Sequence, residues 1–308
     1  MGMPKIAVIG ECMIELSEKQ HALSRHFGGD TLNTAVYLAR RTQQQLDVYY
    51  VTGLGFDSFS HEMLEAWQQE SINTSLVTRL KDKLPGLYFI ETDETGERKF
   101  YYWRNDAAAR YWLKDERSAQ VCQQLSQFDY IYLSGISIAI LDNESRKTLF
   151  AMLAECRRQG GKVIFDNNFR PLLWASLDEA REAYSAILAL TDIAFLTLED
   201  EDMLWGEKPL DEVIARTHGF GVGEIVVKRG SEPCVVWDPR EQHEVAAVKL
   251  PKERVIDTTA AGDSFSAGYL SARLLGADMP TAAQQGHKVA STVIQHRGAI
   301  IPMDAMPD

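Results

Sequence analysis

Near its C-terminal end the chain reads Asp257-Thr258-Thr259-Ala260-Ala261-Gly262-Asp263-Ser264-Phe265-Ser266-Ala267-Gly268, and a helix-like apolar run continues to Leu275. The small residues let a ligand approach the backbone closely, and the start of a helix offers unpaired N–H groups to an anion. Asp263 adds a carboxylate in the first turn, where it can accept a proton from a hydroxyl that attacks a bound phosphate. The stretch therefore predicts a phosphoryl-transfer site. The alternative is that Asp263 only caps a closely packed helix.

Length and charge exclude several classes of protein. With 308 residues and 45% hydrophobic content, the chain can bury a large core in one α/β domain or form a small second one. Its net charge of −12 argues against nucleic acid or an anionic membrane surface as a partner, because both are held by basic faces. Basic residues that matter for function must therefore serve a local site.

The cysteines and the apolar runs indicate the compartment. Four cysteines lie far apart in the sequence, at Cys12, Cys122, Cys156 and Cys234, so neither a disulfide framework nor a zinc site is indicated. No apolar run has the length of a signal peptide or a membrane span. We expect a cytoplasmic protein.

Strand-like and helix-like segments alternate along most of the chain. Short apolar runs predict strands at 6–9, 48–51, 130–133, 163–166 and 193–196, and amphipathic segments predict helices near 62–69, 144–159 and 178–190. This alternation is typical of an α/β fold with a mainly parallel sheet. The segments 86–92 and 98–105 instead predict a β-hairpin around a turn at 93–97, which suggests a small β lid.

Two motifs resemble signatures of the ribokinase/PfkB family of sugar kinases. The stretch from Asp257 to Gly268 resembles the C-terminal signature, with Ala260 where many members have glycine, and Phe27-Gly28-Gly29-Asp30-Thr31-Leu32-Asn33 resembles the N-terminal one. The resemblance implies a single ribokinase-like domain over 1–308, a three-layer α/β/α fold whose β lid comes from segments near 11–28 and 85–105. It also implies that Asp263 is the catalytic base, with an anion hole at Ala260, Ala261 and Gly262.

Further segments resemble the members of that family that phosphorylate keto-deoxy sugar acids at the C6 hydroxyl. They are Gly86-Leu87-Tyr88, Tyr102-x-Arg104, Asp166-x-Asn168-x-Arg170 and Val227-Lys228-Arg229-Gly230. An arginine fork engages a carboxylate through two parallel hydrogen bonds, so Arg104 and Arg170 suit an acidic sugar. The substrate-binding residues implied by the resemblance are Gly28, Gly29, Asp30, Asn33, Tyr88, Tyr102, Arg104, Arg170 and Asp263.

The same resemblance implies that ATP and Mg²⁺ are required, and it leaves room for a monovalent cation. The ATP-binding residues that it implies are Asn168, Arg170, Thr197, Lys228, Gly230, Ala260, Ala261, Gly262 and His287. Thr197 and Asp200 replace the Asn-x-x-Glu pair of many sugar kinases. No direct metal ligand is therefore assigned, and Asp200 is expected to contact Mg²⁺ only through water.

The partners expected are thus a small sugar acid, ATP and further copies of the chain in a homo-oligomer. Three other functions compete with this interpretation. A fructokinase-like enzyme for neutral sugars would share Asp263 but would not need two arginines, and a non-catalytic sugar sensor would share only the fold. A hydrolase would use Ser264 as its nucleophile, with His287 or His296 as the base.

Overall fold

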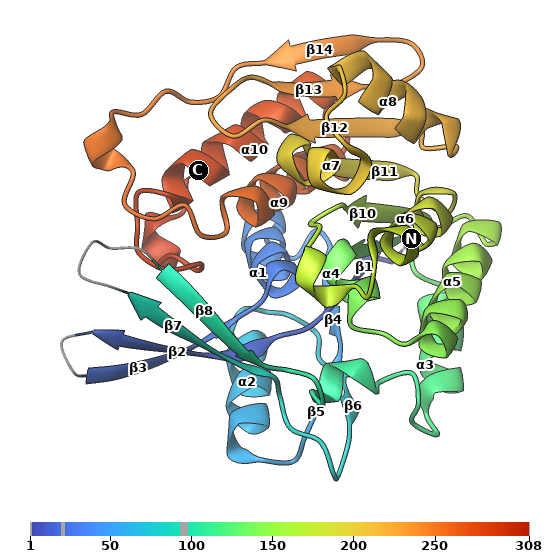
Figure 1. Cartoon of the computed structure of the whole chain (residues 1–308), viewed down its shortest axis with the longest axis vertical. Coiled ribbons are helices and arrows are strands. Elements are labelled where there is room, and N and C mark those ends of the chain that lie inside the picture. The colour runs from blue at the N-terminus through green and yellow to red at the C-terminus, as the bar shows by residue number, and fades with distance from the viewer. Residues whose placement is uncertain (1, 20–21, 93–97, 308) are drawn as a thin grey trace.

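The computed structural model describes residues 2–19, 22–92 and 98–307, and it consists of a large sheet covered by helices and a small separate sheet (Figure 1). The large sheet has eight strands in the order β14-β13-β12-β11-β10-β9-β1-β4. Six of these pair in parallel, namely β1 (Lys5–Ile9), β4 (Asp47–Val51), β9 (Tyr130–Ser134), β10 (Lys162–Asp166), β11 (Ile193–Thr197) and β12 (Glu224–Lys228). An antiparallel edge is added by β13 (Cys234–Trp237) and β14 (Gln242–Val245).

Alternate residues of each strand face opposite helical layers. In β1, Ile6 and Val8 pack into one hydrophobic cluster while Ala7 and Ile9 pack into the other. Both faces of a parallel sheet must be covered because both are apolar. The sheet and the helices on its two faces therefore form the three-layer α/β/α arrangement that the sequence predicts.

Each face of the sheet has its own set of helices. One face is covered by α1 (Asp30–Thr42), α2 (Ser58–Gln69), α9 (Ala261–Arg273) and α10 (Met279–Val293). The other is covered by α3 (Ser118–Leu125), α4 (Gly135–Ala139), α5 (Asn143–Arg158), α6 (Leu177–Leu188), α7 (Leu198–Trp205) and α8 (Leu210–Gly219). Short 3-10 turns lie at η1 (Ala108–Arg110), η2 (Pro171–Leu173), η3 (Lys252–Arg254) and η4 (Met303–Ala305).

The small sheet, which we call the lid, projects from one side of the molecule (Figure 1). Its strands are β2 (Met13–Lys19), β3 (Ala22–Gly28), β7 (Leu87–Thr92) and β8 (Arg98–Trp103), in the order β3-β2-β7-β8. The antiparallel pairing of β7 with β8 confirms the predicted hairpin, whose turn at 93–97 lies outside the described residues. Two short strands, β5 (Gly53–Leu54) and β6 (Thr78–Arg79), pair separately.

The predicted elements agree with the structure apart from their ends. The helix expected near 62–69 begins earlier, at Ser58, because Asp57 caps it by accepting a hydrogen bond from the Ser60 amide at 3.0 Å. The antiparallel edge strands β13 and β14 were not predicted. Within the described part of the chain, no helix is both long and apolar enough to cross a bilayer.

Glycines set the distance between α9 and α10. A Cβ atom at Gly268 would lie 2.7 Å from the Gln285 carbonyl oxygen and 2.9 Å from a methyl carbon of Val289. We predict that Gly268→Ala lowers the free energy of unfolding by about 1–3 kcal/mol, because overpacking forces the two helices apart. Urea denaturation measures this loss.

The matched control is Gly219→Ala at the end of α8, where an added Cβ would meet no atom within 4 Å. This variant should lose no stability, since alanine is favoured over glycine in a helix. Equal stabilities of the two variants would contradict the packing argument.

Candidate active site

The candidate site lies where parallel strands end and the helices α1 and α9 begin. Asp166 ends β10, Thr197 ends β11 and Lys228 ends β12, so their side chains gather at the carboxyl edge of the sheet. Neither α1 nor α9 has a side-chain cap at its first turn. Ligands of open α/β sheets bind at this edge.

Asp263 lies in the first turn of α9, and its carboxylate accepts a hydrogen bond from Asn33 Nδ2 at 2.9 Å. The pKa of Asp263 is raised to about 7, chiefly by burial and also by the negative charges of Asp30 and Asp166. The Asn33 hydrogen bond and the charge of Lys228 act in the opposite direction. A carboxylate with this pKa can take up a proton near neutral pH, as a general base must.

The start of α9 presents hydrogen-bond donors to an anion. Ala260 adopts a left-handed conformation with φ of 59°, and the Ala261 amide donates to the Thr258 carbonyl at 3.2 Å. The amides of Gly262 and Asp263 have no hydrogen-bond partner among the described residues. They are the donors that remain for a phosphate.

The ammonium group of Lys228 lies close to the first turn of α9. A Cβ atom at Gly262 would lie 3.5 Å from Lys228 Nζ. Nζ donates to Asp166 Oδ2 at 2.7 Å, and the Ser266 hydroxyl donates to the same oxygen at 2.9 Å. Asp166 is buried, so this network fixes the position of the ammonium group.

A cavity of about 590 Å³ adjoins the anion site. Its wall is formed by Thr197, Glu199, Lys228, Arg229, Gly230, Ser231, Cys234, Ala247, Val248, Lys249, Leu250, Val255, Thr258, Ala261, Gly262, Phe265, His287, Ala290, Ser291 and Ile294. The lining surface is mainly apolar, and the charged Lys228 lies beside the start of α9, which suits a flat base joined to phosphates. Six of the predicted ATP-binding residues line it, namely Thr197, Lys228, Gly230, Ala261, Gly262 and His287.

The other predicted ATP-binding residues lie outside the cavity wall. Asn168 Nδ2 donates to Asp30 Oδ2 at 2.6 Å, so Asn168 joins the group around Asp263. Ala260 is the residue before α9. Arg170 is half exposed, donates to the Phe169 carbonyl at 2.7 Å and lies 3.5 Å from Asp200.

The histidines do not support a serine hydrolase. The Ser264 hydroxyl donates to the Ala260 carbonyl at 2.7 Å. His287 is buried with Nε2 bonded to the Val245 carbonyl at 3.0 Å, and burial lowers its pKa. His296 Nδ1 lies 3.1 Å from the Thr292 carbonyl. In the part of the chain that the structure describes, neither ring forms a hydrogen bond with Ser264.

The lid carries the aromatic residues expected at a sugar site. Tyr88 and Tyr102 face each other across β7 and β8, with ring centres 5.8 Å apart, and the Arg104 guanidinium lies 5.9 Å from the Tyr102 ring centre. These three side chains therefore lie together on one side of the lid. Two acidic partners were missed by sequence reasoning: Arg104 donates to Glu11, and the Tyr88 hydroxyl donates to Glu15.

Close packing explains the two glycines before α1. A Cβ atom at Gly28 would lie 2.5 Å from the Tyr88 hydroxyl oxygen, and one at Gly29 would lie 2.1 Å from the Glu11 carbonyl oxygen. The carboxylate of Asp30 then follows at the start of the helix, beside Asn168. These residues therefore lie between the lid and Asp263.

The acidic residues of α7 have different surroundings. Asp200 accepts a hydrogen bond from the Phe169 amide at 3.2 Å, and burial raises its pKa. Glu201 is buried and accepts from Asn167 Nδ2 at 2.9 Å, while Glu199 lines the cavity. Across residues 2–19, 22–92 and 98–307, no group of three or more histidine, cysteine, aspartate or glutamate side chains is placed to hold a metal ion.

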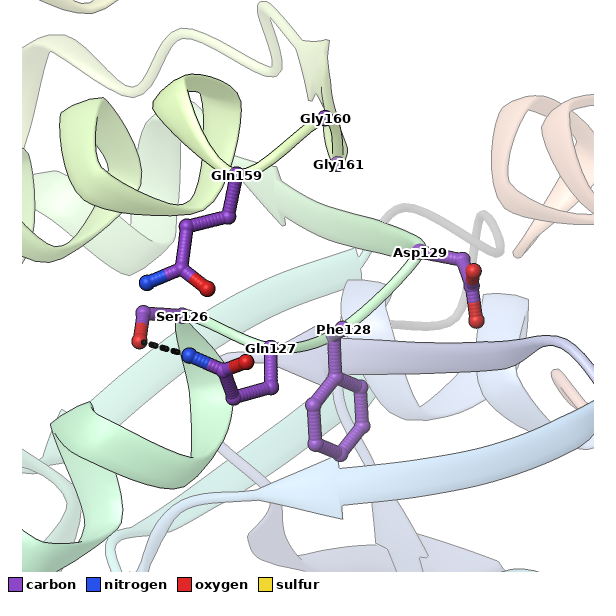
Figure 2. Close-up of a pocket in the computed structure, with 7 residues that line it drawn as sticks. All are labelled: Ser126, Gln127, Phe128, Asp129, Gln159, Gly160 and Gly161. Atoms are coloured by element: carbon purple, nitrogen blue, oxygen red, sulfur yellow. Dashed lines mark hydrogen bonds between the residues drawn. The ribbon is translucent and has the colours of Figure 1, made fainter.

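A second, smaller depression lies at the opposite end of the strands. Figure 2 shows its lining residues, which precede β9 and β10: Ser126, Gln127, Phe128, Asp129, Gln159, Gly160 and Gly161. Its volume of about 120 Å³ is too small for a nucleotide. It contains none of the predicted site residues.

The family of the chain follows from a match over almost its whole length. A model of the pfkB family of carbohydrate kinases matches residues 3–306, and the chain belongs to that family. It is 65% identical over 309 residues to the 2-dehydro-3-deoxygluconokinase of Dickeya dadantii (strain 3937), covering 100% of both chains. It is 63% identical over 305 residues to the enzyme of the same name from Escherichia coli (strain K12), covering 98% of this chain and 99% of that one.

Solved structures support the same fold. A putative ribokinase II from E. coli, in complex with ATP and Mg²⁺, superposes with a TM-score of 0.82 at 22% identity, covering 99% of this chain and 96% of that one. The ribokinase-like fold expected from sequence is thereby confirmed.

The raised pKa of Asp263 predicts how its replacement affects stability. Between the ordinary value of 3.8 and about 7, the folded protein retains a proton that the unfolded chain has lost. The stability from this proton is complete at low pH and is lost as the pH rises through 7. We therefore predict that Asp263→Asn raises the melting temperature relative to the wild type more at pH 8 than at pH 5, because asparagine has no charge to bury.

A helix-capping aspartate gives the matched control. The Asp278 carboxylate accepts a hydrogen bond from the Thr281 amide at 2.8 Å, and its pKa is lowered by hydrogen bonds from Thr281. Asp278→Asn should therefore show no relative gain at pH 8. If the Asp263→Asn difference is the same at both pH values in scanning calorimetry, the buried-charge argument is wrong.

Proposed function

We propose that the chain transfers the γ-phosphoryl group of ATP to the C6 hydroxyl of 2-keto-3-deoxygluconate, also called 2-dehydro-3-deoxygluconate, forming 2-keto-3-deoxy-6-phosphogluconate. The observation that carries the proposal is that the Asp263 carboxylate and Lys228 meet beside a nucleotide-sized cavity, together with a Gly262 amide that has no hydrogen-bond partner among the described residues. The full-length relatives named 2-dehydro-3-deoxygluconokinase support this choice of substrate.

The cavity is the proposed ATP site. Phe265 and His287 contact each other edge to face at 5.0 Å between ring centres and offer an uncharged wall for adenine. The loop at Gly230 also lines the cavity, and the phosphates would extend toward Lys228 and the first turn of α9. The roles of Asn168 and Arg170 toward the nucleotide remain part of this proposal.

The sugar acid is proposed to lie between the lid and α1. Arg104 would bind its carboxylate, and Tyr88 and Tyr102 would contact the carbon chain and hydroxyls. Gly28, Gly29, Asp30 and Asn33 would form the wall toward Asp263, with Arg170 at the solvent-facing edge. The negative charge of Glu15, which Tyr88 contacts, disfavours a substrate carboxylate on that side and directs it toward Arg104.

Catalysis then rests on three groups of the chain. Asp263 accepts the proton of the C6 hydroxyl as that oxygen attacks the γ-phosphorus, while Asn33 keeps the carboxylate in place. The amides at 262 and 263, together with Lys228, stabilise the charge on the transferred group, with the Ala260 turn fixing their direction. ADP leaves with the bridging oxygen.

Mg²⁺ is proposed to enter with ATP, where its charge neutralises the phosphate oxygens. Asp200 fits such an ion only through water, because the Phe169 amide and Arg170 already surround its carboxylate. The proposal also leaves room for a monovalent cation, as the family resemblance does. The structure of a putative ribokinase II from E. coli in complex with ATP and Mg²⁺ supports the use of a nucleotide and a divalent ion.

The cytoplasm is the proposed location, and a homo-oligomer is the proposed assembly. All four cysteines are free, which fits a reducing compartment. Strand β8 is an edge strand of the lid, and its consecutive residues Phe100, Tyr101, Tyr102 and Trp103 are exposed. Such an edge favours pairing with another copy.

The activity is tested by measuring ADP release with ATP and Mg²⁺ on 2-keto-3-deoxygluconate, gluconate, fructose and ribose. We predict the highest kcat/KM on 2-keto-3-deoxygluconate. Asp263→Asn should lower kcat by a factor of about 10²–10⁴, because the general base is lost. The control Asp278→Asn, at the distant start of α10, should retain activity.

Preference for fructose would favour the neutral-sugar kinase. Near-full turnover by Asp263→Asn would refute the role given to the base. No turnover by the wild type on any sugar, together with sugar binding, would favour the non-catalytic sensor.

A further inference from the structure

A buried ion pair joins the lid to the core beside the candidate sugar site. Glu11 follows β1, at the carboxyl edge of the large sheet, and Arg104 follows β8 of the lid. Arg104 donates a hydrogen bond to Glu11 across 93 positions in sequence. This ion pair therefore links the end of β8 in the lid to the core sheet.

The pair is almost completely shielded from water. The exposed fractions of the two side chains are 8% for Arg104 and 1% for Glu11. Burial raises the pKa of Glu11, and the Arg104 charge lowers it, so the guanidinium is what keeps a carboxylate in this place. Neither charge would be tolerated there without the other.

The surrounding backbone is shaped to admit this carboxylate. A Cβ atom at Gly86 would lie 2.6 Å from Glu11 Oε1 and 3.2 Å from Arg104 Cβ. Any larger residue at position 86 would displace the Glu11 carboxylate. Close packing against Glu11 and Arg104 therefore explains why glycine occupies position 86 in the predicted Gly86-Leu87-Tyr88 motif.

Arg104 retains hydrogen-bonding capacity after pairing with Glu11. Its Nε atom is buried and has no hydrogen-bond partner among the described residues, and the same holds for Glu11 Oε1. A buried donor without an acceptor is costly, and a ligand carboxylate would supply the acceptor. Glu11 thus fixes one side of the guanidinium and leaves another for an anion.

We propose that Glu11 is a positioning residue for acid recognition: it holds Arg104 at the junction of lid and core in the orientation that binds the substrate carboxylate. Because the two residues come from the lid and the core, one contact sets both the lid position and the direction of the arginine. Glu11 itself does not bind the carboxylate, since two negative charges would repel. The inference rests on the proposed function, in which the substrate is a sugar acid.

The test compares Glu11→Ala, Arg104→Ala and the double variant in steady-state kinetics with 2-keto-3-deoxygluconate and ATP. Glu11→Ala is expected to raise the KM for the sugar acid about 10–100-fold, as loss of a charge-assisted hydrogen bond does. The kcat should stay within about 5-fold and the KM for ATP within about 2-fold, because α9 and the cavity are untouched. The double variant should match Arg104→Ala within about 3-fold, since positioning requires the residue that is positioned.

Two further variants separate positioning from general destabilisation. Glu11→Gln keeps the shape and an acceptor oxygen, so its KM for the sugar acid should fall between those of the wild type and Glu11→Ala. Glu224→Ala breaks another largely buried ion pair, to Arg273 at 2.7 Å, at the opposite end of the sheet. It should lower the melting temperature and leave both KM values unchanged. If Glu11→Ala does not fold, Glu11→Gln carries the same comparison.

Several outcomes would overturn the inference. They are an unchanged KM for the sugar acid in Glu11→Ala or Glu11→Gln, multiplicative effects in the double variant, or an equal rise in the KM for ATP. Failure of the proposed function is distinguishable, because the wild-type protein itself would then show no activity on the sugar acid.

Discussion

The geometry of the site depends on how the fold stabilises the carboxylates that gather around the first turn of α9. Asp263 shares this region with Asp30 and Asp166, and burial disfavours its charged form. Lys228 and the Asn33 amide offset part of that repulsion. The balance raises the affinity of Asp263 for a proton, and the arrangement that produces it also places unpaired amides where a phosphate can bind.

The rest of the fold holds these charges in place. Asp166 and Lys228 end β10 and β12, which lie on either side of β11 in one parallel sheet, while Asn33 and Asp263 come from helices α1 and α9 that pack together on one face. Close contact of α9 with α10, permitted by Gly268, fixes Asp263 relative to the cavity. The lid is a separate sheet, so the proposed function places substrate choice and phosphoryl transfer in different parts of the chain.

Local sequence patterns predicted the features that depend on local structure. Strand and helix alternation predicted the parallel core, and the run around Asp263 predicted the helix start that carries this carboxylate. Glu11 and Glu15 were missed because their partners, Arg104 and Tyr88, are distant in sequence and meet only when the lid folds. The ion pair of Arg170 with Asp200 was not predicted either, since side-chain direction after a strand is set by tertiary contacts.

The most direct measurement is a ¹³C NMR titration of the side-chain carboxyl carbons in the free protein, with the Asp263 resonance assigned by its loss in Asp263→Asn. This carboxyl is expected to titrate near pH 7, as burial and the nearby negative charges require. Titration near the ordinary value of 3.8 would contradict this, because the crowding of charge at the start of α9 would then have no effect on Asp263.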